Sequence, residues 1–333
     1  MINWMMGEMS NMNEHQIKVW HEKLKQLVME TSKHIIGKEE VIRKMVVAII
    51  AGGHVLLEDV PGTGKTSLAL TLAKVLGLDF KRLQCTPDLL PADVLGTFVY
   101  HPEQREFAFR SGPIFTQLLL VDEINRAVPR MQSALLEAMQ EGKVTIEGHT
   151  MPLSTPFIVL ATANPLESQG IFPLPEAQLD RFLVQLHMGY LSEEREQEMI
   201  KRIRLDQSAE ITTILQPNEI NVIKDFVKKI EVTTDLLAYI VRLGRSTREN
   251  DRILVGASPR AILALTSYAQ ALALLYGRTF VIPDDVKEAF YPVMNHRLIY
   301  RQDYRLEGEA EAKKALFDEL IGNVPVPVEQ VEV

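Results

Sequence analysis

Short apolar runs alternate with segments of helical periodicity in the first half of the chain. The runs are rich in branched and aromatic residues, and polar or turn-forming residues follow each one, as is typical of buried strands. The segments between them are long enough for crossover helices, so the pattern predicts an α/β fold with a mostly parallel sheet. The five predicted strands cover residues 54–58, 80–86, 118–123, 157–164 and 182–188.

The strand pattern fades after Tyr190, and apolar residues then recur at helical spacing. This change predicts a second domain built from helices. The helices with the plainest pattern cover residues 218–230, 235–245 and 259–276. We therefore expect an α/β core, a helical domain and an extended tail, with bounds at residues 1–189, 190–320 and 321–333.

A glycine-rich segment follows the first predicted strand. It reads Pro61-Gly62-Thr63-Gly64-Lys65-Thr66 and leads into a predicted helix over residues 67–76. Such a loop directs backbone N–H groups and a helix N-terminus at phosphate oxygens, while the lysine reaches the β and γ phosphates and the threonine can bind Mg²⁺. The strict pattern has a glycine where Asp59 stands, at the start of the loop. A chance match is the alternative, and the flanking strand and helix argue against it.

Two acidic residues, Asp122 and Glu123, end the apolar run that begins at Leu118. A carboxylate pair at the edge of a parallel sheet can hold Mg²⁺ through its water shell and polarise an attacking water. The residues at a solvated strand end could also be acidic without any catalytic role. Beside a phosphate-binding loop, the pair instead predicts nucleotide hydrolysis, with Asp122 at the metal and Glu123 at the water.

Three further polar residues are candidates for the same chemistry. Asn164 ends the fourth predicted strand and could orient the attacking water, although Asn-Pro also commonly starts a turn. Arg181 precedes the fifth predicted strand, and Arg260 begins a predicted helix in the second domain. A guanidinium suits the charge that develops on a transferred phosphoryl group, but either arginine could equally form a surface ion pair.

Composition narrows the class of protein. The chain has 333 residues, of which 46% are hydrophobic and 24% charged, as in ordinary globular proteins. The net charge of −8 provides no global basic field for nucleic acid or an anionic membrane. Glycines interrupt the longest apolar run, residues 45–57, which is too short to span a membrane, and the start lacks a secretion signal. With Cys85 as its one cysteine, we expect a cytoplasmic protein without membrane insertion.

The order of these motifs resembles that of AAA+ ATPases. Three longer stretches resemble MoxR proteins in particular, which are related to the ATPase subunits of magnesium chelatase. These stretches are Asp122-Glu123-Ile124-Asn125-Arg126-Ala127, residues 132–141 and residues 174–182. The resemblance extends from about residue 35 to about residue 299.

This resemblance implies an αβα core with a parallel five-stranded sheet and an all-helical lid. It also implies a homo-oligomeric ring, expected to be a hexamer, with ATP and Mg²⁺ between neighbours. In the family pattern Glu123 activates water, Asn164 is sensor 1, Arg181 is the arginine finger and Arg260 is sensor 2. Thr66 and Asp122 match the metal-binding positions. The residues implied to bind nucleotide are Ile36, Gly37, Pro61, Gly62, Thr63, Gly64, Lys65, Thr66 and Ser67.

Two predicted hairpins match inserts of the same family. Aromatic residues in 98–100 and 107–109 flank one turn, and residues 144–146 lead through Gly148 into a return strand. In a remodelling ring these hairpins could grip a partner, or they could pack on the neighbouring subunit. Both interpretations remain open from the sequence.

Three functions are compatible with these motifs. The first is a chaperone-like ATPase that remodels or activates a protein partner, in this family typically one with a von Willebrand factor A domain. The second is a nucleic-acid motor, and the third is a nucleotide-gated interaction module without significant turnover. Basic and acidic residues around the hairpins offset one another, so we favour the protein partner. These residues are Arg105, Arg110, Lys143 and His149 against Glu103, Glu106, Glu141 and Glu147.

Overall fold

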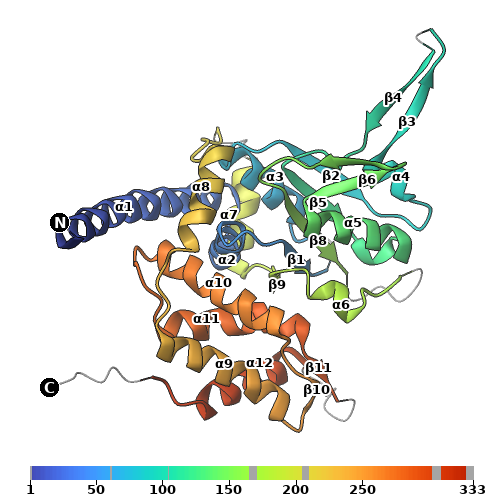
Figure 1. Cartoon of the computed structure of the whole chain (residues 1–333). Helices are drawn as coiled ribbons and strands as arrows, with labels where there is room; N and C mark the ends of the chain where they lie inside the picture. The colour runs from blue at the N-terminus through green and yellow to red at the C-terminus, as the bar shows by residue number, and fades with distance from the viewer. Residues whose placement is uncertain are drawn as a thin grey trace, which may run out of the picture. The chain divides into compact units, whose positions relative to one another are not determined.

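A five-stranded sheet organises the first half of the computed structural model (Figure 1). Its order is β2-β5-β8-β1-β9, and the pairs β2/β5, β5/β8 and β1/β8 are parallel. All five predicted strands are present, each shorter than its apolar run. Their bounds are Val55–Glu58 for β1, Phe80–Gln84 for β2, Leu118–Asp122 for β5, Ile158–Ala163 for β8 and Val184–Leu186 for β9.

The structure describes residues 2–60, 62–103, 105–164, 171–204, 210–301 and 309–327. The chain divides into two compact units. One comprises Gln26–Phe182 and Leu186–Val222, and the other comprises Met1–Lys25, Leu183–Gln185 and Ile223–Val333. No helix in the described ranges is long and apolar enough to cross a membrane. The domain bounds expected from the sequence stay a prediction.

Both faces of the central strands are buried, which is why they read as continuous apolar runs. Residues 118–121 are fully buried, and α5 packs Leu135, Leu136 and Met139 against the face that carries Leu119 and Val121. The helices and helical turns of this unit are α2 (Glu39–Ile50), α3 (Lys65–Val75), α4 (Pro91–Leu95), η1 (Ile124–Arg126), α5 (Pro129–Glu141), α6 (Glu176–Leu179) and α7 (Glu193–Arg204).

Two antiparallel hairpins extend from this unit, as the sequence predicts. The first pairs β3 (Gly96–His101) with β4 (Glu106–Ser111), and it projects far from the sheet in Figure 1. The second pairs β6 (Lys143–Ile146) with β7 (His149–Pro152). A Cβ at Gly96 would lie 2.4 Å from the Arg110 carbonyl oxygen, so the base of the first hairpin requires glycine there.

Helices dominate the second unit. The hydroxyls of Thr233 and Ser258 accept hydrogen bonds from the first turns of α9 and α10 and so fix where these helices begin. Tyr239, Tyr268, Phe290 and Phe317 are buried in this unit. Two helices have residues in both units, α1 (Ile2–His34) and α8 (Pro217–Val227). The other helices in the described part of the chain are α9 (Thr234–Glu249), α10 (Pro259–Leu275), α11 (Pro283–Met294), η2 (Asn295–Arg297) and α12 (Glu309–Asn323).

The expected αβα core with a helical lid is confirmed, and the structure adds one short two-stranded ladder to the lid. β10 (Ile253–Val255) pairs with β11 (Ile299–Tyr300) in a short antiparallel ladder. Strands this short give too few alternating positions for a periodicity signal. The last helix also continues to Asn323, and residues 328–333 of the expected tail lie outside the described residues.

Candidate functional site

The loop between β1 and α3 has the backbone that a phosphate-binding loop requires. Gly62 and Gly64 adopt left-handed conformations, with φ of 83° and 88°, and α3 begins directly after them at Lys65. Side chains other than glycine are strained at such φ values. The loop and the first turn of α3 offer N–H groups to an anion. Pro61, an expected member of this site, lies outside the described residues.

The Lys65 ammonium lies over the start of the same loop. Its Nζ donates to the carbonyl oxygens of Asp59 at 2.8 Å and of Val60 at 3.0 Å. Burial lowers the pKa of Lys65, and the nearby negative charge of Asp59 partly opposes this shift. Phosphate oxygens are stronger acceptors for an ammonium than neutral carbonyls, so an incoming phosphate can replace these two contacts.

Asp59, which stands where the strict loop pattern has glycine, ties the loop to the segment after β9. Its Oδ1 accepts from the Val60 N–H and its Oδ2 from the Gly189 N–H, each at 2.7 Å. Lys38 donates to the carbonyl oxygens of Met188, Gly189 and Tyr190 at 2.6, 2.8 and 3.1 Å. Burial lowers the pKa of Lys38, while Asp59 acts in the opposite direction. This carboxylate therefore has a structural role that the sequence pattern did not indicate.

The acidic pair sits at the end of β5, where the chain turns sharply. Asp122 is 6% exposed, and Glu123 adopts a left-handed conformation with φ of 56°. The Thr162 hydroxyl on β8 connects the two residues. It accepts from the Glu123 backbone N–H at 2.9 Å and donates to Asp122 Oδ1 at 3.2 Å. Thr162 was not predicted as a site residue, because a threonine inside an apolar strand has no distinctive sequence pattern.

Strand β2 contributes two more polar residues that sequence analysis missed. Arg82 Nε donates to Asp122 Oδ2 at 2.6 Å, and Gln84 Nε2 donates to Glu123 Oε2 at 2.9 Å. Arg82 Nη2 also donates to Gln84 Oε1 at 3.1 Å. Glu123 has a second cationic neighbour, since Arg126 Nε lies 3.2 Å from its Oε2. The only sequence indication of these residues was weak. Arg82 and Gln84 alternate with an apolar residue on β2, the first strand in the order of the parallel sheet.

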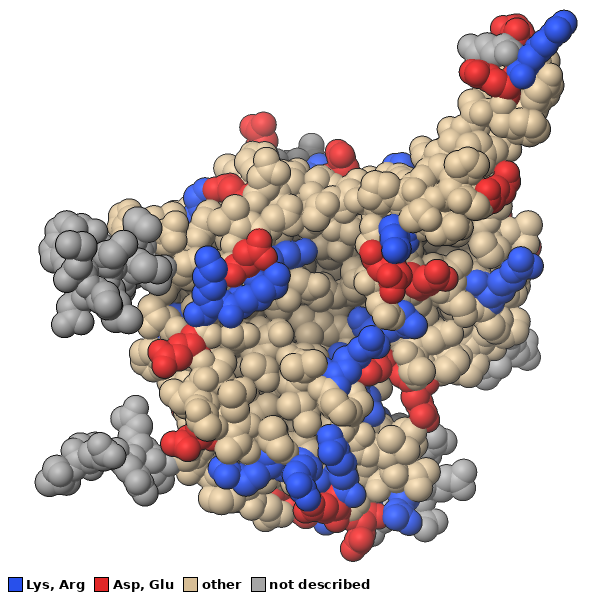
Figure 2. All heavy atoms as spheres, in the orientation of Figure 1, with Lys and Arg blue, Asp and Glu red and all other residues tan. Residues whose placement is uncertain are grey.

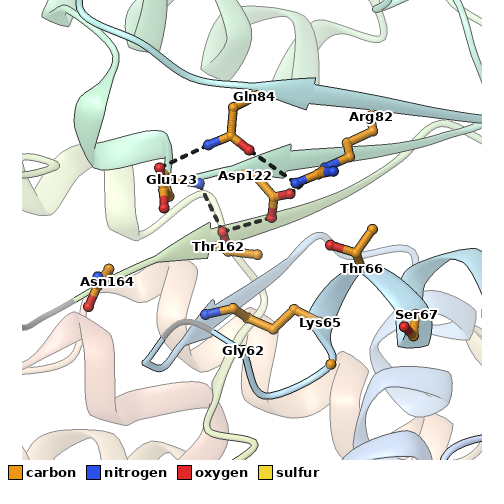
Figure 3. Close-up of a pocket in the computed structure, with 11 residues that line it drawn as sticks. Gly62, Lys65, Thr66, Ser67, Arg82, Gln84, Asp122, Glu123, Thr162 and Asn164 are labelled. Atoms are coloured by element: carbon orange, nitrogen blue, oxygen red, sulfur yellow. Dashed lines mark hydrogen bonds and ion pairs between the residues drawn. The ribbon is translucent and has the colours of Figure 1, made fainter.

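These residues line one open cavity of about 360 Å³ (Figure 3). Asn164, which is 5% exposed, forms part of its wall at the end of β8. The structure thus brings most of the expected loop residues together with both acids and the asparagine. The described residues that line it are Gly62, Gly64, Lys65, Thr66, Ser67, Arg82, Gln84, Asp122, Glu123, Thr162 and Asn164.

Among the described residues, the lining does not include the expected site residues Ile36, Gly37, Thr63, Arg181 and Arg260. Gly37 has φ of 68°, and a Cβ there would lie 2.8 Å from Leu191 Cδ2, so Ile36 and Gly37 form a tight turn against the segment that follows β9. Arg181 Nη1 donates to the Leu136 carbonyl oxygen at 3.1 Å and to Gln140 Oε1, both on α5. Arg260 is exposed in the first turn of α10, within the second unit.

The oxygen donors in the cavity fit a magnesium ion that arrives with a nucleotide. Thr66 supplies a hydroxyl and Asp122 a carboxylate, and Mg²⁺ usually binds one or two such groups together with substrate phosphates and waters. Among the residues that the structure describes, no cluster of three or more His, Cys, Asp or Glu side chains could hold a metal by itself. The donor set therefore suits Mg²⁺ bound to ATP better than a protein-only metal site.

Comparisons with known proteins identify the family of the chain. Residues 54–184 match the family described as ATPases associated with various cellular activities, and residues 245–319 match the AAA lid domain. The uncharacterized protein YeaC of Bacillus subtilis strain 168 is 42% identical over 93% of this chain and 97% of its own. Chaperone MoxR1 of Mycobacterium tuberculosis is 41% identical over 84% of this chain and 76% of its own. The crystal structure of a candidate ATPase from Cytophaga hutchinsonii is 38% identical, covers 96% of this chain and 99% of its own, and has a TM-score of 0.87.

Proposed function

Because this chain belongs to the MoxR family of AAA+ ATPases, we propose that it binds ATP with Mg²⁺ in the cavity beside β5 and hydrolyses it. One observation carries the proposal. The phosphate-binding loop, the acidic pair Asp122 and Glu123, and Asn164 all line a single cavity, although they come from three separate segments of the chain. A binding loop alone would support nucleotide binding, whereas the acids supply the groups that hydrolysis needs.

Each group in the cavity has a distinct task. The loop N–H groups and Lys65 hold the phosphates, and Thr66 and Asp122 hold the metal. Bound Mg²⁺ would neutralise charge on the phosphate oxygens. Glu123 accepts the proton of the attacking water, and Asn164 orients that water. The hydrogen bond from Gln84 and the ion pair with Arg126 both involve Glu123 Oε2, so these two contacts hold the side chain in its present orientation.

The two arginines outside the cavity would act on nucleotide from other parts of the assembly. Arg181 is held against α5 by Leu136 and Gln140 and is not among the residues lining the cavity of its own chain. This placement supports a role in trans, as an arginine finger on ATP held by the neighbouring subunit of a homo-oligomeric ring, which we take to be a hexamer. Arg260 would serve as the lid arginine that senses the nucleotide, and Ile36 and Gly37 would lie against adenine.

The hydrolysis cycle would act on a protein partner. The β3–β4 hairpin carries an aromatic ladder, defined here as Phe98, Tyr100, Phe107 and Phe109, which share one face of the hairpin. Ring centroids are 5.4 Å apart in the inner pair, Phe98 and Phe109, and 5.3 Å apart in the outer pair, Tyr100 and Phe107. The outer pair is exposed, 49% for Tyr100 and 67% for Phe107, as expected of residues that grip a polypeptide.

Charge supports a protein rather than a nucleic acid as the partner. Figure 2 shows both signs of charge at the end of the projecting hairpin and mostly uncharged residues along its length. A strand of nucleic acid would need a continuous basic groove. We propose a chaperone-like remodeller that works in the cytoplasm on a partner with a von Willebrand factor A domain. The chaperone name of the Mycobacterium tuberculosis relative supports the general role.

The test is ATP turnover by the purified full chain in the presence of Mg²⁺. Glu123→Gln removes the base and keeps the size of the side chain, so turnover should fall by at least about a hundredfold while ATP binding persists. Lys65→Ala is the matched comparison, because it removes a phosphate contact and should weaken binding itself. Parental turnover in Glu123→Gln would refute the assignment of the base, and absence of turnover in the parent chain would favour a nucleotide-gated module.

A further inference from the structure

Asp122 already has a cationic partner within its own chain. The Arg82 Nε donates to Asp122 Oδ2 at 2.6 Å, while the Thr162 hydroxyl occupies Oδ1. The Asp122 side chain is 9% exposed and that of Arg82 is 50% exposed. A carboxylate buried to this extent is stable in its charged form only when hydrogen bonds and a nearby positive charge compensate it. Arg82 supplies that positive charge at the edge of the cavity.

The contact between Arg82 and Asp122 conflicts with the role of Asp122 as a metal ligand. A divalent cation near Asp122 Oδ2 would lie close to the Arg82 guanidinium, and the two positive charges repel each other in a partly dehydrated cavity. The Asp122 carboxylate cannot form its strongest interaction with Arg82 and with the metal at the same time. Either the guanidinium moves out toward solvent, which its exposure permits, or the metal binds less tightly.

We propose that Arg82 is a positioning residue that compensates Asp122 while no metal is bound and competes with Mg²⁺ for this carboxylate. Arg82 thereby sets how much Mg²⁺ strengthens nucleotide binding. The inference rests on the proposed function, since it takes Asp122 as the metal-binding carboxylate. The Arg82 guanidinium also donates to Gln84, whose amide holds Glu123, so one side chain contacts the metal carboxylate directly and the catalytic base through a single intermediary.

Lys81 offers a matched control on the same strand. It is exposed and precedes Arg82, and successive side chains of a strand point to opposite faces. Lys81→Ala therefore removes one positive charge from β2 without removing the hydrogen bond to Asp122. Arg82→Lys keeps the charge but replaces a planar group that contacts both Asp122 and Gln84 with a single ammonium.

The experiment measures the affinity of the full chain for mant-ADP, a fluorescent diphosphate that cannot be hydrolysed to drive the ATPase cycle. Dissociation constants are taken in EDTA and in saturating Mg²⁺ at constant ionic strength, because salt screens such charges. The readout is the dissociation constant in EDTA divided by the dissociation constant in Mg²⁺, so a larger ratio means that Mg²⁺ strengthens nucleotide binding more. Arg82→Ala should raise this ratio by about three- to tenfold, Arg82→Lys should fall between it and the parent, and Lys81→Ala should leave it unchanged.

Other results would overturn the inference. An unchanged or smaller ratio in Arg82→Ala means that Arg82 does not compete with the metal. If the ratio is unchanged because both dissociation constants rise by the same factor, Arg82 contacts phosphate instead. If circular dichroism shows that Arg82→Ala is unfolded, the same criteria apply to Arg82→Lys and Arg82→Gln. A parent chain that binds mant-ADP neither with nor without Mg²⁺ would refute the proposed function itself, and the Arg82 inference with it.

Discussion

Replacing Thr162 by valine tests whether a hydroxyl on β8 positions both acidic residues of the site. Thr162 is 1% exposed, and its hydroxyl contacts the Glu123 N–H and Asp122 Oδ1. Valine has almost the same shape, so the substitution removes two hydrogen bonds and opens no cavity. It leaves a partly buried N–H without its acceptor and a buried carboxylate oxygen with one donor fewer.

The magnitude follows from these two contacts. A hydrogen bond to a charged group contributes about 1.5–3 kcal/mol, and an unsatisfied buried N–H costs about 1–3 kcal/mol. The additional apolar burial of valine offsets about 1 kcal/mol. The sum is a net loss of about 1.5–5 kcal/mol in the free energy of unfolding, and the partial burial of the Glu123 N–H places the expected loss in the lower half of this range. Turnover should fall by about ten- to a hundredfold, because a small displacement of the base or of the metal carboxylate misaligns the reacting atoms.

Hydrogen–deuterium exchange of a peptide spanning residues 118–126 measures the effect at the Glu123 amide, and steady-state ATP turnover measures its catalytic consequence. Thr162→Ser is the control, because serine keeps the hydroxyl and loses a methyl group worth about 1 kcal/mol. The serine variant should retain amide protection and most of the turnover. If valine and serine behave alike in both assays, the hydroxyl does not position the acids and the reasoning is wrong.

Two further predictions concern assembly and pH. Arg181→Ala should lower turnover by about 10³- to 10⁵-fold while keeping ATP binding. Mixing Arg181→Ala with Lys65→Ala subunits should restore some activity at mixed interfaces. Verified mixed rings that remain inactive would exclude an arginine finger that acts in trans. Hydrogen bonds from the Lys33 side chain and the Thr212 N–H lower the pKa of Glu30 to about 2. Its contribution to stability is therefore present above pH 4.5 and lost as the pH falls toward 2. Glu30→Gln should lower the urea midpoint at pH 7 by an amount that shrinks at pH 3, and a constant difference would contradict this.

The parallel sheet was predictable because its central strands are buried on both faces. Leu118 to Val121 are apolar at every position, which a half-exposed strand would not tolerate. The same burial made the loop after β1 recognisable, since its glycines punctuate an otherwise apolar pattern. Strands β10 and β11 escaped prediction because their pairing depends on the folding of the helices around them.

The residues of the site also fall into two groups, those that the sequence predicts and those that only the structure reveals. Lys65, Thr66 and the acidic pair follow from local patterns, since each lies in a short segment whose chemistry can be recognised on its own. Arg82 and Thr162 become part of the site only through strand pairing, and each contacts Asp122 from 40 residues away in the sequence. Nothing in a local pattern indicates which strands become neighbours, so these contacts required the structure.

The projecting hairpin has a consequence for solubility. A two-stranded ribbon leaves an unpaired row of backbone groups along each outer edge, and exposed aromatic side chains beside open edges favour aggregation between strands. The tip of the hairpin carries Glu103 and Arg105 in the turn and Glu106 at the start of β4, and charges at such positions oppose pairing between strands. The charges at the tip thus oppose aggregation of the exposed aromatic ladder. Neutralising those three residues should increase self-association of the chain through this hairpin.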